Sequence, residues 1–145
     1  MNLAFSSHAP KESRGELEEL LFLNPRQHRV RAGIVRSLER FGHPEVVETA
    51  TGLGVRIGKL EAQNLFAFDR DQVSDAPVGI VVFSRTSPAE MTVLHVAVHP
   101  DYALYSDPGG GLGITLVEQV KAIAARIVGI ERVVFFYRQE VVLRL

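Results

Sequence analysis

Two nearly continuous apolar runs, VGIVVF at residues 78–83 and VLHVAV at 93–98, constrain the fold more than any other feature of the chain. Each has the length of a strand, and each lacks the alternation of apolar and polar residues that is typical of a strand with one face in water. Strands without that alternation are buried on both faces. We therefore expect both strands at the centre of a sheet that is covered on either side.

Further strand patterns flank these two runs. LGVRIGK at 53–59 alternates and LFAFDR at 65–70 follows it, while the central strands extend over 78–85 and 91–98. The connections between the four segments are short and rich in turn-forming residues. Because short connections join antiparallel neighbours, the pattern predicts an antiparallel meander.

A helical pattern and another strand come after the meander. Gly129 supplies a C-terminal stop, and the apolar residues before it recur at helical spacing: Leu112, Leu116, Val120, Ile123 and Ile127. ERVVFFYR at 131–138 is the next strand, and VVLRL at 141–145 is a short last one. A strand, a helix and a strand in succession form a crossover, which places the two strands parallel.

The N-terminal part predicts two helices. The first begins at the capping-box spacing SRGE (13–16) and ends near Leu23, and the second begins at NP (24–25) and stops at GHP (42–44). A chain of 145 residues that is 46% hydrophobic has the size and composition of one domain, here 1–145. The expected class is α/β (α+β), with a mixed, mostly antiparallel sheet, two N-terminal helices and one crossover helix after the central strand.

The end of the second apolar run carries a motif. LHVAVHPDY (94–102) leads into GGGLGITLVEQV (109–120) and then IERVVFFY (130–137). This order of central strand, glycine-rich loop, helix and strand resembles the acyl-CoA-binding core of the GCN5-related N-acetyltransferases (GNAT) over residues 77–138. Val96, Val98, Pro100 and Tyr102 match the family's pattern at the end of that strand. The resemblance implies a GNAT-like fold that uses acetyl-CoA or another acyl-CoA as co-substrate.

The resemblance also implies which residues hold the coenzyme. The backbone of Val96 and Val98 would hold the pantetheine arm, and the pyrophosphate would lie on the amides of Gly109, Gly110, Gly111, Gly113 and Ile114. Such a site is physically sound, because a helix start offers amides without helical partners and the positive end of the helix dipole. The alternative is that the glycines form only a flexible connector.

The sequence departs from the family around this loop. Pro108 stands where the family usually has glutamine or arginine, and residues 103–107 lengthen the loop and bring an aspartate near the expected phosphates. Thr92 occupies the position of the family's frequent glutamate base. Glu90 and His95 are the nearest substitutes, and His95 is the candidate catalytic base because a neutral imidazole accepts protons. The alternative is a hydrogen-bonded histidine within the sheet.

A further departure lies after the last long strand. The family continues into a helix with a tyrosine acid, whereas this sequence stops at Leu145. Of Tyr102, Tyr105 and Tyr137, we take Tyr137 as the candidate acid for protonating the leaving thiolate. The missing strands would expose a sheet edge, which proteins usually cover. VVLRL or a partner subunit would cover it, so a homodimer is expected.

Composition excludes several classes of function. The formal net charge of −1 favours neither nucleic acid nor an anionic membrane as a partner, and the absence of cysteine excludes disulfides and thiolate chemistry. His95 and His99 are roughly 13 Å apart along a strand, too far to share a zinc ion, so no metal is expected. The arginine-rich stretch 26–40 has no interleaved aromatic residues and is interpreted as a solvated or salt-bridged face.

The N-terminus lacks the pattern of a signal peptide, and no apolar run approaches the ~20 residues of a membrane span, so a cytoplasmic protein is expected. The predicted function is an acyl-CoA-dependent N-acyltransferase that transfers an acetyl group to a small-molecule or protein amine. The alternative is a non-catalytic acyl-CoA-binding sensor or protein-interaction module with the same fold.

Overall fold

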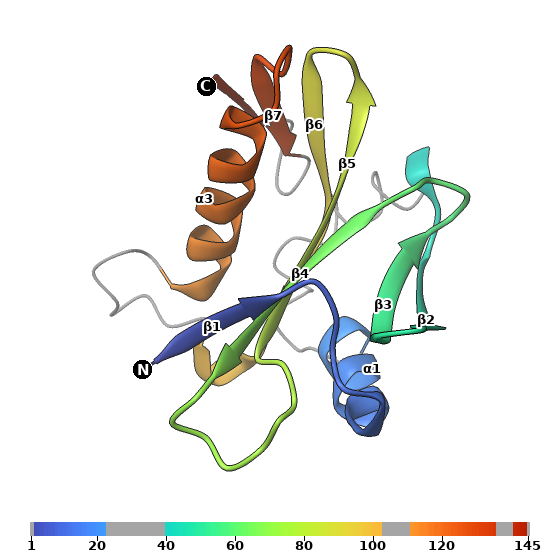
Figure 1. Cartoon of the computed structure of the whole chain (residues 1–145), viewed down its shortest axis with the longest axis vertical. Coiled ribbons are helices and arrows are strands. Elements are labelled where there is room, and N and C mark those ends of the chain that lie inside the picture. The colour runs from blue at the N-terminus through green and yellow to red at the C-terminus, as the bar shows by residue number, and fades with distance from the viewer. Residues whose placement is uncertain (1, 23–39, 103–110, 136–140, 145) are drawn as a thin grey trace.

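The computed structural model describes residues 2–22, 40–102, 111–135 and 141–144 (Figure 1). Its main element is a six-stranded sheet in the order β1-β4-β5-β6-β7-β8. Neighbouring strands are antiparallel except β6 and β7, which are parallel, so the predicted mixed sheet and its crossover are confirmed. The strands are Leu3–Ser6 (β1), Gln63–Asp69 (β4), Gly79–Ser87 (β5), Glu90–Val98 (β6), Arg132–Phe135 (β7) and Val141–Arg144 (β8).

The two apolar runs form the central strands of this sheet. In β5 every residue from Gly79 to Ser84 is buried, and in β6 every residue from Met91 to His95 is buried. Both faces of these strands are packed against other elements, which explains why their sequences carry no polar alternation. The prediction of central strands covered on both faces is confirmed.

One face of the sheet is covered by α3 (Leu112–Ala125), the crossover helix between β6 and β7 (Figure 1). The helix lies very close to β5: a Cβ added to Gly79 would be only 2.9 Å from Cδ2 of Leu112. Glycine therefore permits this approach. The core on this side combines residues of the helix with residues of the sheet: Leu112, Leu116, Val120 and Ala124 with Val81, Met91, Val93 and Val133.

The end of α3 differs from the predicted one. The helix ends at Ala125, and Ile123 and Ile127 are only partly buried. Gly129, with φ of 96°, lies in the turn that leads into β7. The prediction that Gly129 stops the helix directly is wrong, because the chain leaves the helix after Ala125 to reach the parallel strand.

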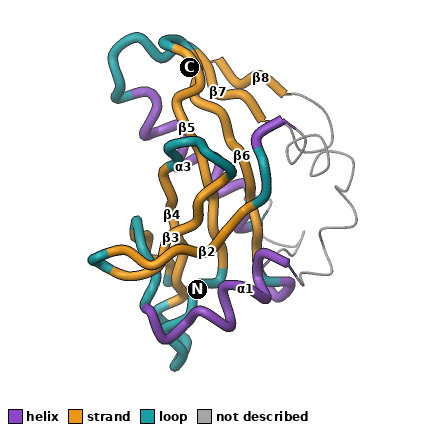
Figure 2. Tube along the Cα trace, turned by 90° about the vertical axis from the view of Figure 1, so that its right-hand side faces the viewer, coloured by secondary structure: helices purple, strands orange, loops and turns teal. Residues whose placement is uncertain are grey.

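The other face is covered by α1 (Arg14–Phe22) and a separate hairpin of β2 (Pro44–Thr49) and β3 (Gly52–Ile57) (Figures 1 and 2). The predicted strand at 53–59 exists, but it pairs with β2 and lies outside the main meander. The Asn64 side chain ties the hairpin to β4, since Oδ1 accepts from the Val55 amide at 2.8 Å and Nδ2 donates to the Val55 carbonyl at 2.9 Å. The prediction of one continuous meander is thus wrong at its first strand.

The first predicted helix is confirmed, and α1 begins at Arg14, within the predicted SRGE segment. A 3-10 turn at Lys11–Ser13 precedes α1, and the Ser13 hydroxyl donates to the Pro10 carbonyl at 2.7 Å. The second predicted helix falls on residues 23–39, outside the described part, although Arg40 and Phe41 are helical. No helix among the described residues is long and apolar enough to cross a membrane.

β6 contains an irregularity that determines which side chains share a face. Val82 pairs with His95 and Phe83 pairs with Val93, so Leu94 is an extra residue on β6. Such a bulge shifts the side-chain alternation of the strand. Val96 and Val98 therefore face α3, whereas His95, opposite Val82, faces the side of α1 and the hairpin.

The predicted short last strand is confirmed as β8, which pairs antiparallel with β7 from Arg132↔Arg144 to Phe135↔Val141. It covers the edge of β7 that the sequence was expected to leave open. The homodimer stays a prediction.

Candidate functional site

The described pairing of β6 with β7 covers only the first part of β6. It runs from Glu90↔Arg132 to Val93↔Phe135, and β6 continues to Val98. The residues that follow β7, 136–140, lie outside the described part. Val96 is half-buried and Val98 is buried, with both side chains on the α3 face.

α3 starts beside the end of β6. Gly111 is its N-cap with φ of 90°, a conformation that residues with a side chain rarely adopt. Its carbonyl accepts from both the amide and the hydroxyl of Thr115 at 3.3 Å. A Cβ on Gly113 would lie 3.8 Å from Cγ2 of Val98, so the first turn of α3 and the end of β6 are in contact.

The start of α3 has the properties of an anion site. The amides of Leu112, Gly113 and Ile114 have no partner within the helix, and they point along the positive end of its dipole. The Ile114 side chain is 52% exposed. The structure thus brings together Val96, Val98, Gly111, Gly113 and Ile114 of the predicted coenzyme site. Gly109 and Gly110 lie outside the described residues.

The candidate base His95 is not at an open surface. Its side chain is 4% exposed, and burial lowers the pKa of His95 to about 4. The neighbouring candidates also have structural contacts: the Thr92 and Thr86 hydroxyls are 2.6 Å apart, and Glu90 accepts from Nε of Arg132 at 3.1 Å. The candidate acid Tyr137 lies outside the described residues.

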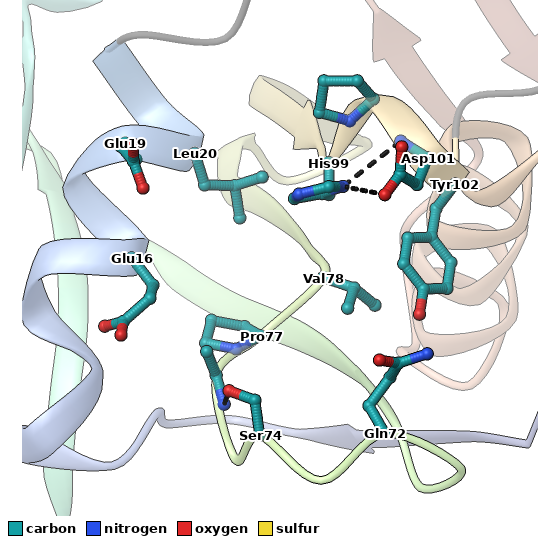
Figure 3. A pocket seen from close by; sticks show the side chains of 12 residues that line it. Glu16, Glu19, Leu20, Gln72, Ser74, Pro77, Val78, His99, Asp101 and Tyr102 are labelled. Atoms are coloured by element: carbon teal, nitrogen blue, oxygen red, sulfur yellow. Dashed lines mark hydrogen bonds and ion pairs between the residues drawn. The ribbon is translucent and has the colours of Figure 1, made fainter.

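A pocket that the sequence did not predict lies at the same end of β6, beside α1 (Figure 3). Its volume is about 630 Å³. One wall is α1, the floor is the connection between β4 and β5, and the opposite wall is the 3-10 turn Pro100–Tyr102 that follows β6. Three segments distant in sequence form the pocket. In the sequence, the one indication of a charged site here was the pair Glu16 and Glu19, one helical turn apart.

His99 occupies the wall opposite α1. Its Nδ1 accepts the Asp101 amide at 3.2 Å and lies 3.8 Å from an Asp101 carboxylate oxygen. Because Nδ1 accepts a hydrogen bond, the proton of the neutral ring is on Nε2. The side chain is 50% exposed, so it is available to a molecule in the pocket.

Tyr102 fixes this wall to the sheet. Its hydroxyl donates to Oδ2 of Asp69 at 2.7 Å, and Oδ1 of Asp69 accepts the Asp71 amide at 3.0 Å. The hydrogen bond from Tyr102 is the main cause that lowers the pKa of Asp69. Burial, followed by the bond to Asp69, raises the pKa of Tyr102 to about 12. The pair therefore holds the neutral phenol against the ionised carboxylate.

The sheet order, the parallel β6–β7 pair, the crossover helix and the position of its glycine cap define a GNAT-like fold. Three solved structures that resemble it are described as acetyltransferases. An acetyltransferase from Streptococcus agalactiae 2603 superposes with a TM-score of 0.54 at 12% identity, covering 93% of this chain and 73% of its own.

Two further structures are more distant in shape. An IAA acetyltransferase from Bacillus cereus ATCC 14579 has a TM-score of 0.47 and 17% identity, over 92% of this chain and 65% of its own length. A Desulfovibrio desulfuricans protein described as an acetyltransferase of the GNAT family has a TM-score of 0.46 and 18% identity, over 92% and 72%. The chain thus spans about two thirds of the length of the Bacillus cereus enzyme. No protein-family model and no curated protein matches the sequence.

Proposed function

We propose that the chain is an acyl-CoA-dependent N-acyltransferase, which transfers an acetyl group from acetyl-CoA to an amine. The observation that carries the proposal is the junction between β6 and α3. There a glycine cap with φ of 90° opens the helix directly against Val98, on the face to which Val96 also points. The GNAT-like fold supports this placement.

In this proposal the pyrophosphate of the coenzyme lies on the amides of Gly111, Gly113 and Ile114. Backbone amides and the helix dipole stabilise an anion there without a cationic side chain. The pantetheine arm follows the backbone of Val96 and Val98, beyond the section of β6 that pairs with β7. The chain thereby positions the thioester, which is its main contribution to the reaction.

The transfer itself is a direct attack. The amine nitrogen forms a bond to the carbonyl carbon of the thioester, the carbon–sulfur bond breaks, and the amine proton ends on the coenzyme thiolate. A base with a pKa of about 4 is a poor acceptor for an ammonium whose pKa is about 10. We therefore propose that His95 has a structural role in the sheet and is not the catalytic base. Tyr137 stays the predicted proton donor to the thiolate.

Thermal unfolding with acetyl-CoA tests the coenzyme site, because a ligand that binds only the folded state raises the melting temperature. The decisive variant is Gly113→Asp. A carboxylate in the first turn of a helix favours the helix, yet it repels a phosphate. We expect a shift for the wild type and none for Gly113→Asp. Gly111 is unsuitable for this test, since its φ of 90° would strain any substitute.

Gly15→Asp is the matched control, because Gly15 lies in the first turn of α1 and a Cβ there meets open space. It should keep the full shift. An equal shift for Gly113→Asp would contradict the proposed site, and a wild type that does not respond to millimolar acetyl-CoA would contradict the proposed function.

Release of the coenzyme thiol tests the reaction. The chain contains no cysteine, so a thiol-reactive dye reports coenzyme release without a protein background. We expect release that requires both acetyl-CoA and an amine from a panel of small amines and lysine peptides. Binding of acetyl-CoA without release across that panel would leave an acyl-CoA-binding protein without transferase activity.

A further inference from the structure

The pocket beside α1 has the size of a ligand site and lies apart from the proposed coenzyme site. Its volume of about 630 Å³ falls within the range of small-molecule pockets. Val98 packs against α3, whereas the next residue, His99, lines the pocket on the side of α1 (Figure 3). The two sites therefore share the end of β6, with Val98 and α3 at one site and His99 and α1 at the other.

The pocket lining carries three carboxylates and one histidine. Glu16 and Glu19 lie on α1, and Asp101 lies on the opposite wall with its carboxylate 3.8 Å from Nδ1 of His99 (Figure 3). Among the described residues that line the pocket, none is lysine or arginine. Three carboxylates against one histidine repel an anion and favour a cation in the pocket.

Part of the pocket lining is apolar. Leu20, Pro77 and Val78 contribute to its lining, and Leu20 and Val78 are themselves buried, at 6% and 9% exposure. A metal ion or another fully hydrated cation gains nothing from such a surface, whereas an alkyl chain does. The lining thus fits an organic cation with a hydrocarbon part.

We propose that this pocket binds a small alkylammonium ion. Its ammonium group lies between the α1 carboxylates and Asp101, and its alkyl part lies on Leu20 and Val78. The inference is independent of acyl transfer, because it rests on the cavity and its lining alone. It adds a second, cation-selective site to a chain whose proposed coenzyme is an anion.

Three probes of nearly equal size test the charge preference: n-butylammonium, 1-butanol and butyrate, at constant ionic strength and without coenzyme. Titrations followed by NMR of the protein amides or by calorimetry give the dissociation constants. We expect binding of n-butylammonium, with affinities for 1-butanol and butyrate lower by about tenfold or more. Equal affinities for the three probes, or the absence of n-butylammonium binding, would overturn the proposal.

Variants test the location. Glu16→Gln/Glu19→Gln should weaken n-butylammonium binding by about tenfold or more, since it removes both charges of the α1 wall. The matched control is Glu12→Gln/Glu48→Gln, which removes two exposed carboxylates outside the pocket and should leave binding unchanged. If both double variants bind like the wild type, the site is not this pocket.

A second type of variant guards against a misfolded protein. Gln72 is exposed at the rim of the pocket, so Gln72→Lys adds a competing ammonium group without changing the core. It should abolish n-butylammonium binding while circular dichroism and the melting temperature stay near those of the wild type. Undiminished binding by this folded variant would likewise overturn the proposal.

Discussion

The two sites proposed at the end of β6 differ in the groups that would select their ligands. On the α3 face the recognising groups are backbone amides, freed by helix geometry and exposed by glycine. On the α1 face they are the side chains of Glu16, Glu19 and Asp101. The first kind of site depends on the path of the backbone, so it tolerates changes of neighbouring side chains. The second depends on individual charged side chains, so single substitutions would change it.

The largest effect is expected from weakening the packing of α3 on the sheet, because the proposed coenzyme site depends on the position of this helix. Leu116 is fully buried between α3 and the sheet. Leu116→Ala leaves a cavity, so we expect the free energy of unfolding to fall by about 2–5 kcal/mol. Urea unfolding measures the change. Ile114→Ala on the same helix is the control, because Ile114 is 52% exposed and its truncation should cost less than about 0.5 kcal/mol. Similar losses for the two variants would mean that α3 does not pack as described.

Exchanging ligands between variants tests whether the two sites are separate. Gly113→Asp should weaken acetyl-CoA binding by about tenfold or more and leave n-butylammonium binding within about twofold. Glu16→Gln/Glu19→Gln should show the reverse. Calorimetry with each ligand on each variant measures both effects. A variant that weakens both ligands equally would show that one site, or one conformational change, underlies both.

The hydrogen bond between Tyr102 and Asp69 tests the pocket side separately, because it holds the pocket wall to β4. Tyr102→Phe should lower the free energy of unfolding by about 1 kcal/mol, the typical contribution of one hydrogen bond. Urea unfolding at several pH values measures the difference between wild type and variant.

This difference should depend on pH at both ends. The folded pKa of Tyr102, about 12, exceeds its ordinary value of 10.0, so its contribution is complete below pH 10 and is lost as the pH rises toward 12. The folded pKa of Asp69 is lowered from 3.8, so its contribution is present above that value and is lost as the pH falls through the folded pKa. A difference that stays constant across this range would contradict the pairing.

The smallest expected effect is the coupling between the two ligands. Charges at the two sites would be roughly 10 Å apart. In water a pair of unit charges at that separation attracts by roughly 0.4 kcal/mol, and salt screens most of it. Saturating n-butylammonium should therefore tighten acetyl-CoA binding by no more than about twofold. Strong competition between the ligands would show that they occupy one site.

The central strands, the crossover and the start of α3 were predictable, because each has a local cause in the sequence. Continuous apolar residues indicate strands buried on both faces, and the glycines before Leu112 fit a helix start with an unusual backbone angle. β1 and β2 were not predicted. β1 has four residues, and β2 begins at Pro44, which was interpreted as the stop of the preceding helix. β1 pairs with β4, which is distant in sequence, and β2 pairs with β3, which follows it after a turn.

The pocket could not be predicted for the same reason. Its walls come from α1, from the connection after β4 and from the turn after β6, and no local pattern brings these segments together. The burial of His95, by contrast, was predictable, because His95 lies within the apolar run 93–98 that indicates a strand covered on both faces.

The extra residue at Leu94 makes β6 a strand with two phases. Before it, odd-numbered side chains face α3, and after it, even-numbered ones do. Removal of Leu94 would restore one phase and leave His95 and Val96 on their present faces, whereas insertion of one residue after Leu94, with the bulge retained, would exchange the environments of His95 and Val96. The bulge therefore explains why a strand so uniformly apolar still has a defined orientation, and why its length is far less tolerant of change than its composition.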